Sequence, residues 1–245
     1  MRIGVNCGHT VSGAGCGAVG IINESEHTRL VGHALMNMFR NAGIEVVDCT
    51  IDKASTNNEY LSSAVALANR QDLDWFISIH FNASSSHQGS GVEVYTYEGR
   101  QYDDAVEVCK NISDMGFINR GVKAGTGLYV IRKTKAKAML IEVCFCDNEF
   151  DAATYLAWGE EKIAQAIFDA LQPHVVENEV PDGEMAIMGR SVATEVQLNA
   201  YLLAHNPQGA DYLSLAGIFL EEGEKEGVRG DIALNSISWW RILEV

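Results

Sequence analysis

Apolar and polar residues follow two different patterns along the first two thirds of the chain. Short runs that are almost wholly apolar, or that alternate every second residue, predict β-strands. These runs lie at residues 2–7, 44–51, 74–81, 91–97, 127–131 and 138–145. Apolar residues at three- and four-residue spacing predict amphipathic helices between them. The helical stretches lie at residues 25–42, 59–70, 102–116 and 149–171. This alternation predicts an α/β fold, a mostly parallel twisted sheet with helices on both faces.

The pattern changes near residue 175. The segment "QPHVVENEVPDGE" at 172–184 holds two of the chain's three prolines and four acidic residues, which is typical of a linker. Beyond it, two shorter helices are predicted at 191–204 and 211–226. We therefore expect a main catalytic domain, an acidic linker and a small helical C-terminal segment, at residues 1–175, 176–190 and 191–245.

The composition is that of a folded protein without a membrane span. A chain of 245 residues can bury a sizeable core, and 47% hydrophobic with 21% charged residues is ordinary for a globular domain. No apolar run approaches the roughly 20 residues of a membrane-spanning helix. The start "MRIGVNCGHT" enters a strand directly and lacks the features of a signal peptide. We expect synthesis in the cytoplasm, with release or export by another route.

The charge argues against nucleic acid as a partner. The net charge is −15, and about half of it, −8, comes from the residues after Val175. Such a surface repels phosphate backbones. The basic run at 132–137 is short and is better interpreted as a solvated turn.

The six cysteines lack CxxC pairs and the density of a disulfide scaffold, so they fit a reducing compartment. Several lie in apolar runs, where a free thiol behaves as a small hydrophobic group. A thiolate metal site that includes Cys7 and Cys16 remains an alternative.

The segment "NCGHTVSGAGCGAVGIINE" at 6–24 follows the first predicted strand and admits two interpretations. Gly15, Gly17 and Gly20 have the G-x-G-x-x-G spacing of a dinucleotide site, and Asp48 could serve as its ribose-binding acid. However, the first glycine of such a site follows the strand at once, whereas here it comes eight residues later. We therefore favour a flexible loop that connects metal ligands, with a nucleotide-binding oxidoreductase as the alternative.

Three polar residues lie where parallel sheets bind ligands, near the carboxyl ends of strands. His9 follows the first strand, and His80 lies near the end of the strand at 74–81. Glu24 lies in the first turn of the next helix, where Asn23 and Glu26 suggest a capping box and the helix dipole keeps a carboxylate ionised. Each also has a simpler interpretation, a helix-capping acid or a hydrogen-bonded structural histidine.

Glu142 is less easily explained by structure alone. It lies in the middle of the apolar strand at 138–145, where an unpaired carboxylate costs several kcal/mol or takes up a proton. A nearby cation would stabilise it. Two histidines and a glutamate form a set typical of catalytic zinc, which leaves the fourth position to water. A second, non-ligating glutamate beside that water would act as general base and acid.

Six segments carry a family resemblance. They are "GVNCGHT", "GIINE", "SIHFNA", "NRGVK", "LYVIR" and "MLIEVCFCDN". In order and spacing they resemble the zinc-dependent N-acetylmuramoyl-L-alanine amidases of the Amidase_3 type, with clostridial and phage endolysins the most similar in character. The resemblance covers roughly residues 1–172.

The resemblance implies a zinc hydrolase acting on peptidoglycan, which cuts the amide between the muramic acid lactyl group and L-alanine. It implies Glu142 as the catalytic carboxylate. The implied Zn²⁺ ligands are His9, Glu24 and His80. Asn82 and Arg120 match family motif positions near the site and are carried over as candidate substrate contacts. A catalytically silent peptidoglycan-binding module on the same fold is the alternative, although such a module has no need of a carboxylate buried in a strand.

Residues 191–245 resemble the beginning of a cell-wall glucosaminidase-type domain. They lack a match to the catalytic glutamate of such domains, so we expect no glycosidase activity. Glu221 and Glu222 are expected to be solvated helix residues. We hypothesise that this segment binds wall glycan or forms a homo-oligomer, with Trp239 and Trp240 covering an apolar surface.

Overall fold

The computed structural model divides into two units, Met1–His174 and Val175–Val245. It describes residues 1–171, 217, 218, 220, 221 and 225. The described residues of the second unit are helical, as predicted for 211–226, and the exposed Glu221 pairs with Lys225 at 3.0 Å between Oε1 and Nζ. Several predictions concern residues that lie outside the described ones. These are the linker at 176–190, the helix at 191–204, Glu222, Trp239 and Trp240.

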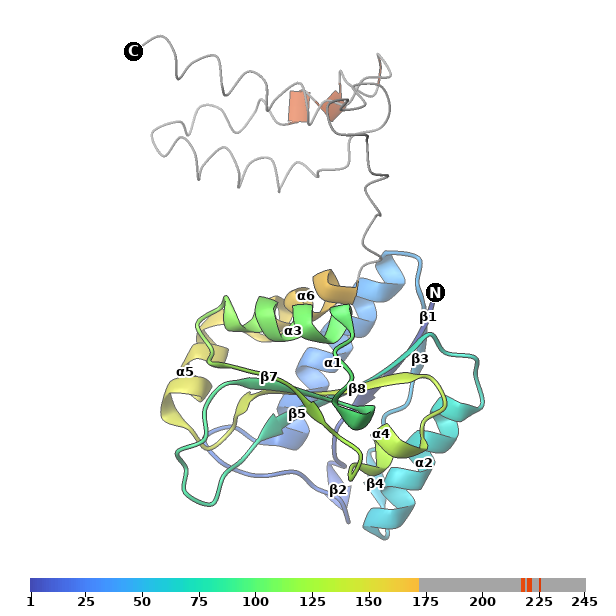
Figure 1. Ribbon diagram of the computed structural model, residues 1–245, viewed down its shortest axis with the longest axis vertical. Helices are drawn as coiled ribbons and strands as arrows, with labels where there is room; N and C mark the ends of the chain where they lie inside the picture. The colour runs from blue at the N-terminus through green and yellow to red at the C-terminus, as the bar shows by residue number, and fades with distance from the viewer. Residues whose placement is uncertain (172–216, 219, 222–224, 226–245) are drawn as a thin grey trace. The chain divides into compact units, whose positions relative to one another are not determined.

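The first unit is built on a six-stranded sheet with the order β3-β1-β5-β8-β6-β7 (Figure 1). Its strands are β1 (Arg2–Cys7), β3 (Glu45–Asp48), β5 (Trp75–Asn82), β6 (Val92–Thr96), β7 (Asn119–Ala124) and β8 (Lys137–Phe145). All neighbouring strands are parallel except β6 and β8, which are antiparallel. The predicted α/β class and mostly parallel sheet are confirmed. Two short strands, β2 (Ser12–Gly13) and β4 (Lys53–Ala54), form a separate parallel pair.

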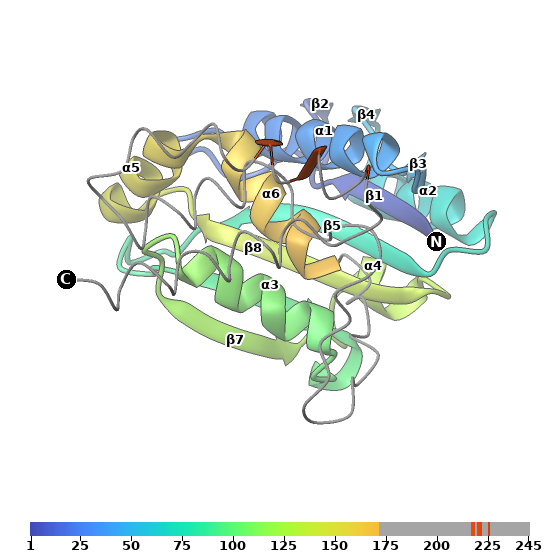
Figure 2. The same cartoon turned by 90° about the horizontal axis from the view of Figure 1, so that it is seen from above.

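Helices cover both faces of the sheet. On one face lie α1 (Glu24–Asn41), α3 (Asp103–Ser113) and α6 (Glu160–Leu171), which Figure 2 shows in front of the strands. On the other lie α2 (Asn57–Asn69) and α4 (Tyr129–Lys133), and α5 (Glu149–Trp158) follows β8. The side chains of β5 alternate between the two faces, because Ile77 and Ile79 belong to the larger core and Phe76 to the smaller one under α2 and α4.

Besides the two short strands β2 and β4, which were not predicted, three parts of the fold differ from the prediction. Residues 127–131 were expected as a strand, but Tyr129–Lys133 form α4, because a short apolar run has no period that separates a strand from one helical turn. The helix expected at 149–171 breaks at Gly159, whose φ of 78° interrupts the helical backbone. β7 was not predicted, because its sequence "NRGVKA" is polar, as edge strands often are.

The sheet brings one row of ionisable side chains together. β1, β5 and β8 run in one direction, so their carboxyl ends lie at one edge, and the antiparallel β6 brings its amino end to that edge. Glu142 of β8 pairs with His80 of β5 on one side and with Glu93 of β6 on the other. Three neighbouring strands therefore place an ionisable residue at the same level. Residues two apart in a strand point to the same face, and Leu140 belongs to the smaller core under α2 and α4. Glu142 therefore points to that face of the sheet.

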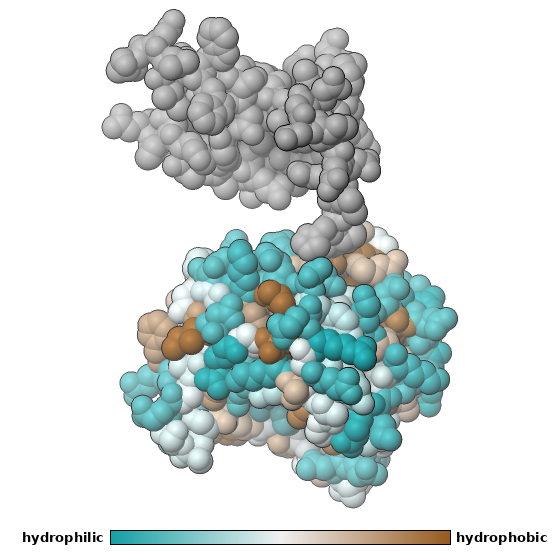
Figure 3. All heavy atoms as spheres, in the orientation of Figure 1, coloured by the Kyte–Doolittle hydropathy of each residue, from teal (hydrophilic) through white to brown (hydrophobic). Residues whose placement is uncertain are grey.

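The face of the first unit seen in Figure 3 is mostly hydrophilic, and its apolar patches are small and separate. Within the part of the chain that the structure describes, no helix has the length and apolar character needed to cross a membrane.

Candidate metal centre

The three predicted ligands converge on one point at the carboxyl edge of the sheet. The Oε1 atom of Glu24, at the start of α1, lies 3.0 Å from His9 Nε2 and 3.2 Å from His80 Nδ1. One ligand atom from each of the three residues lies within 4.8 Å of the others. Among the described residues, no other group of His, Cys, Asp and Glu side chains has this geometry. Cys7, which is buried, and Cys16, which is exposed, are not part of it, so the thiolate alternative gains no support.

The tautomer of His80 is fixed by a chain of hydrogen bonds. Asn6 Nδ2 donates to the carbonyl of Cys49 at 3.0 Å, so its Oδ1 accepts from the Ser78 hydroxyl at 2.8 Å. The Ser78 hydroxyl has given its one proton to Asn6, and its oxygen lies 3.0 Å from His80 Nε2. His80 Nε2 must therefore carry the proton that it donates to Ser78, which leaves a lone pair on Nδ1.

His9 is oriented in the same way. Its Nδ1 lies 3.0 Å from the carbonyl oxygen of Gly15, which can only accept, so Nδ1 carries the proton and Nε2 the lone pair. Two imidazole lone pairs then face one oxygen of Glu24, an arrangement that repels unless a positive charge lies between them. A metal cation fits this donor set, since ligating histidines donate their other N–H to a carbonyl or polar group.

The glycines of the 6–24 loop make room for these ligands. A Cβ atom at Gly8 would lie 2.4 Å from Cε1 of His80, and one at Gly17 would lie 2.7 Å from Oε2 of Glu24. His9 itself has a φ of 65°, a left-handed conformation that non-glycine residues adopt rarely and mostly at functional sites. This geometry favours a loop that connects metal ligands over one that holds a pyrophosphate.

Glu24 is held as a carboxylate. Burial alone would raise its pKa, but positive charge on the imidazoles of His80 and His9 would outweigh burial and lower it, and a cation held between these groups would act in the same direction. The backbone N–H groups of Ala18 and Phe81 also donate to it, at 2.9 Å and 3.1 Å. The suggested capping box is wrong, because the Asn23 side chain makes no cap hydrogen bond. Glu24 therefore belongs to one cluster with the two histidines, and its role exceeds that of a residue suited to the helix dipole.

Glu142 lies beside this cluster without being part of it. Its Oε2 atom is buried and has no hydrogen-bond partner. Burial first, and then the negative charges of Glu24 and Glu93, raise the pKa of Glu142 well above its usual value. A half-buried carboxyl group with one buried, unpartnered oxygen next to a candidate metal site is suited to accept and return a proton.

The two candidate substrate contacts meet at a residue that the sequence reasoning missed. Asn82 Nδ2 donates to Glu93 Oε1 at 2.8 Å, and Arg120 Nε donates to Glu93 Oε2 at 2.6 Å. Glu93 is an acid in an apolar strand, the same signal that singled out Glu142. The structure therefore places Arg120 of β7 on the far side of Glu142 from the histidines, whereas Asn82 lies on β5 with His80 and reaches the same buried acid with its side chain.

Comparison with known proteins decides the family. Residues 3–173 match the family model described as N-acetylmuramoyl-L-alanine amidase. The chain belongs to this family. Its fold is similar to the catalytic domain of the CD27L endolysin targeting Clostridia difficile, with 32% identity and a TM-score of 0.64 over 69% of this chain and 96% of that domain.

Curated relatives of this amidase chain include longer proteins. An uncharacterized protein of Clostridium perfringens, CPE1502, is 35% identical over 75% of this chain and 56% of its own length. The N-acetylmuramoyl-L-alanine amidase CwlM of Bacillus licheniformis is 32% identical over 62% of this chain and 59% of its own length. The chain therefore spans little more than half the length of these relatives.

The hydrogen-bond chain behind His80 leads to a prediction for Ser78. We expect Ser78→Ala to weaken metal binding by about 10- to 100-fold, because His80 loses the acceptor that fixes its tautomer. Competition with a chromophoric chelator measures this affinity. Ser113→Ala, on α3 at the other face of the sheet, serves as the control and should bind metal as the unchanged chain does. An unchanged affinity in Ser78→Ala would refute the positioning role.

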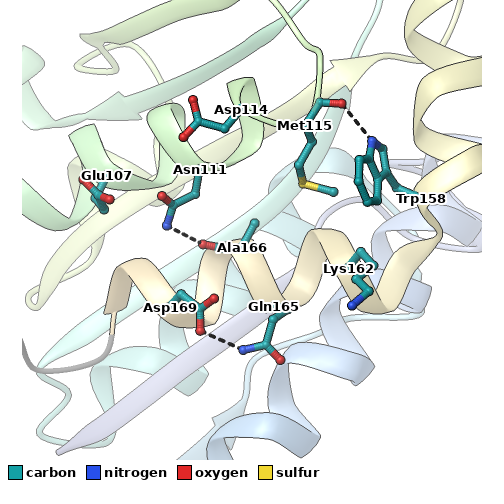
Figure 4. Close-up of a pocket in the computed structure, with 9 residues that line it drawn as sticks. All are labelled: Glu107, Asn111, Asp114, Met115, Trp158, Lys162, Gln165, Ala166 and Asp169. Carbon is teal, nitrogen blue, oxygen red and sulfur yellow. Dashed lines mark hydrogen bonds between the residues drawn. The ribbon is translucent and has the colours of Figure 1, made fainter. Parts of the chain in front are cut away.

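An open pocket lies between α3 and α6, beside Trp158 at the end of α5 (Figure 4). It is lined by Glu107, Asn111, Asp114, Met115, Trp158, Lys162, Gln165, Ala166 and Asp169. The Trp158 indole donates to the carbonyl of Met115 at 2.8 Å, which fixes one wall. None of these residues contributes to the His9–Glu24–His80 cluster, so the pocket has no part in the candidate centre.

Proposed function

We propose that this chain hydrolyses the amide bond between N-acetylmuramic acid and L-alanine in bacterial peptidoglycan, with Zn²⁺ as its metal. The observation that carries the proposal is the convergence of His9, Glu24 and His80 beside the unpartnered oxygen of Glu142. Membership of the amidase family supports the reaction and the substrate. CwlM, which is named for this activity, and the CD27L endolysin catalytic domain are consistent with it.

The donor set favours zinc among the common metals. Two imidazoles and one carboxylate, with a fourth position left open, are typical of catalytic zinc sites. The lone pairs on His9 Nε2 and His80 Nδ1 and the ionised Glu24 are ready to bind a cation without further proton loss. A zinc ion held there would polarise the amide carbonyl and lower the pKa of a water molecule toward neutrality.

Glu142 would carry the proton. Its free Oε2 accepts a proton from the attacking water and then returns it to the nitrogen of the departing alanine. The strand fixes its position, because Glu142 and His80 are paired across β8 and β5. The hydrogen bonds behind both histidines hold the ligand rings in place while this proton moves.

A catalytically silent peptidoglycan-binding module is the alternative. Such a module would gain nothing from a carboxyl group with one buried and unpartnered oxygen, which destabilises the fold. Binding of wall glycan and homo-oligomer formation by residues 191–245 remain predictions, as does action on the wall after release or export.

Digestion of purified cell walls tests the proposal. We expect free amino groups of L-alanine to appear in step with the loss of turbidity, while no new reducing sugar ends form. Mass spectrometry of the soluble products identifies the bond that is cut. Binding to walls without release of peptide would favour the silent module, and reducing ends would indicate a glycosidase instead.

A further inference from the structure

A second charged cluster lies next to Glu142 and is centred on Glu93. The Glu93 side chain is only 3% exposed, and four side chains donate to its carboxylate. The Glu93 cluster consists of Glu93, Asn82, Tyr95, Arg120 and Lys123. Asn82 and Tyr95 bind Oε1, each at 2.8 Å, while the two cations bind Oε2.

A β-bulge in β7 brings both cations to the same carboxylate oxygen. Val92 pairs with Asn119 and Val94 pairs with Val122, so β7 has one more residue than β6 between these pairs. Gly121, with a φ of 75°, lies in this bulge. In a regular strand, residues 120 and 123 would point to opposite faces, and the extra residue turns both toward Glu93.

The charges of the Glu93 cluster do not balance. One carboxylate faces two cationic groups, which leaves a net positive charge. The cations are also accessible, since the side chains of Arg120 and Lys123 are 33% and 35% exposed. The Arg120 guanidinium lies 5.1 Å from the centre of the Phe145 ring, which fixes its plane. Oriented cations with spare N–H donors and one uncompensated charge are what an anion-binding site offers.

The position of the Glu93 cluster indicates that it lies on the peptide side of the scissile bond. Glu142 lies between Glu93 and His80 across three neighbouring strands, and β7 with Arg120 and Lys123 lies beyond Glu93, so His80 and the two cations are on opposite sides of Glu142. If the carbonyl group lies at the metal ligands and Glu142 protonates the departing nitrogen, the alanine and the peptide that follows it extend toward Glu93. The carboxyl group of the lactyl side chain is part of the scissile amide and is not free. The free carboxylates near this bond therefore belong to the peptide.

We propose that Arg120 and Lys123 bind the first carboxylate beyond the alanine of the peptide stem. This inference rests on the proposed amidase function and assigns its specificity on the peptide side. Neighbouring strands are about 4.8 Å apart, and an extended residue spans about 3.4 Å, so a carboxylate one residue beyond the alanine can reach the cluster. Glu93 is then the buried residue that holds the two cations in place.

Two synthetic muramoyl-peptides test this specificity. They differ in one group, a free carboxylate or its primary amide on the residue after alanine. We expect the unchanged chain to cleave the carboxylate form with a kcat/KM at least about tenfold higher, mainly through a lower KM. In Lys123→Gln the preference should fall severalfold, while Arg120, Asn82 and Tyr95 still satisfy Glu93. Arg120→Lys, which keeps the charge but loses the planar fork, should retain part of the preference.

Lys110→Gln is the matched control. Lys110 is an ion-paired lysine on the other face of the sheet, where it binds Asp114 at 3.0 Å, and its loss should leave the preference intact. Equal cleavage of the two substrates by the unchanged chain would overturn the inference, as would a preference that survives in Lys123→Gln. Cleavage of neither substrate would instead refute the proposed function itself, so the two failures are distinguishable.

Discussion

Glu142→Gln is expected to keep the metal and to lose turnover by about 10²- to 10⁴-fold. Glutamine has the same shape as glutamate, but its amide cannot accept a proton from water or return one to the leaving nitrogen. The buried Oε2 of Glu142 has no hydrogen-bond partner, so the substitution breaks no hydrogen bond of that atom. The measurement is kcat on a defined muramoyl-peptide together with the metal content per chain.

Glu149→Gln is the control for this experiment. Glu149 is exposed, begins α5 and is not part of the His9–Glu24–His80 cluster, so its substitution should leave both kcat and metal content unchanged. Wild-type turnover in Glu142→Gln would contradict the role of Glu142 as proton carrier. Loss of metal in the same variant would place Glu142 among the ligands.

His9→Ala is expected to abolish both metal binding and turnover. The variant removes one of the three proposed ligands, so the loss of affinity should exceed the 10- to 100-fold effect expected for the supporting residue Ser78. His9 is the most exposed of the three ligands, with 27% of its side chain accessible, so its replacement disturbs the fold least. Removal of the metal from the unchanged chain with a chelator should also abolish turnover. Added Zn²⁺ should restore turnover to the chelated unchanged chain but not to His9→Ala.

His33→Ala, an exposed histidine on α1, should behave as the unchanged chain does. One equivalent of bound metal in His9→Ala would contradict the ligand assignment. Full turnover of the chelated, metal-free chain would contradict the metal-dependent mechanism altogether.

The parts of the fold that were predictable are those buried on both faces. β1, β5 and β8 are nearly continuous apolar runs, and such runs indicate central strands of a parallel sheet. β7 has no such run, because an edge strand is largely polar and depends on its pairing with β6. The residues of α4 are apolar but too few to show a helical period.

The site was predictable in its residue types and less so in its contacts. His9, Glu24, His80 and Glu142 stand out in the sequence because each is polar in or beside an apolar strand or at a helix start. The hydrogen bonds that orient His80 depend on the strand register, which pairs Asn6 with Ser78. This register cannot be inferred from either residue alone. Glu93 gave the same signal as Glu142 and was overlooked. Its two cations could not be assigned to it, because the bulge at Gly121 decides which way they point.

Anomalous diffraction at the zinc absorption edge tests the metal centre most directly. A crystal of the unchanged chain grown with zinc should show a peak about 2.0–2.2 Å from His9 Nε2, His80 Nδ1 and one carboxylate oxygen of Glu24. The carboxyl group of Glu142 should lie nearby but outside bonding distance. Zinc peaks elsewhere with none at these three atoms, or a peak bound by Glu142 with Glu24 turned away, would contradict the proposed centre.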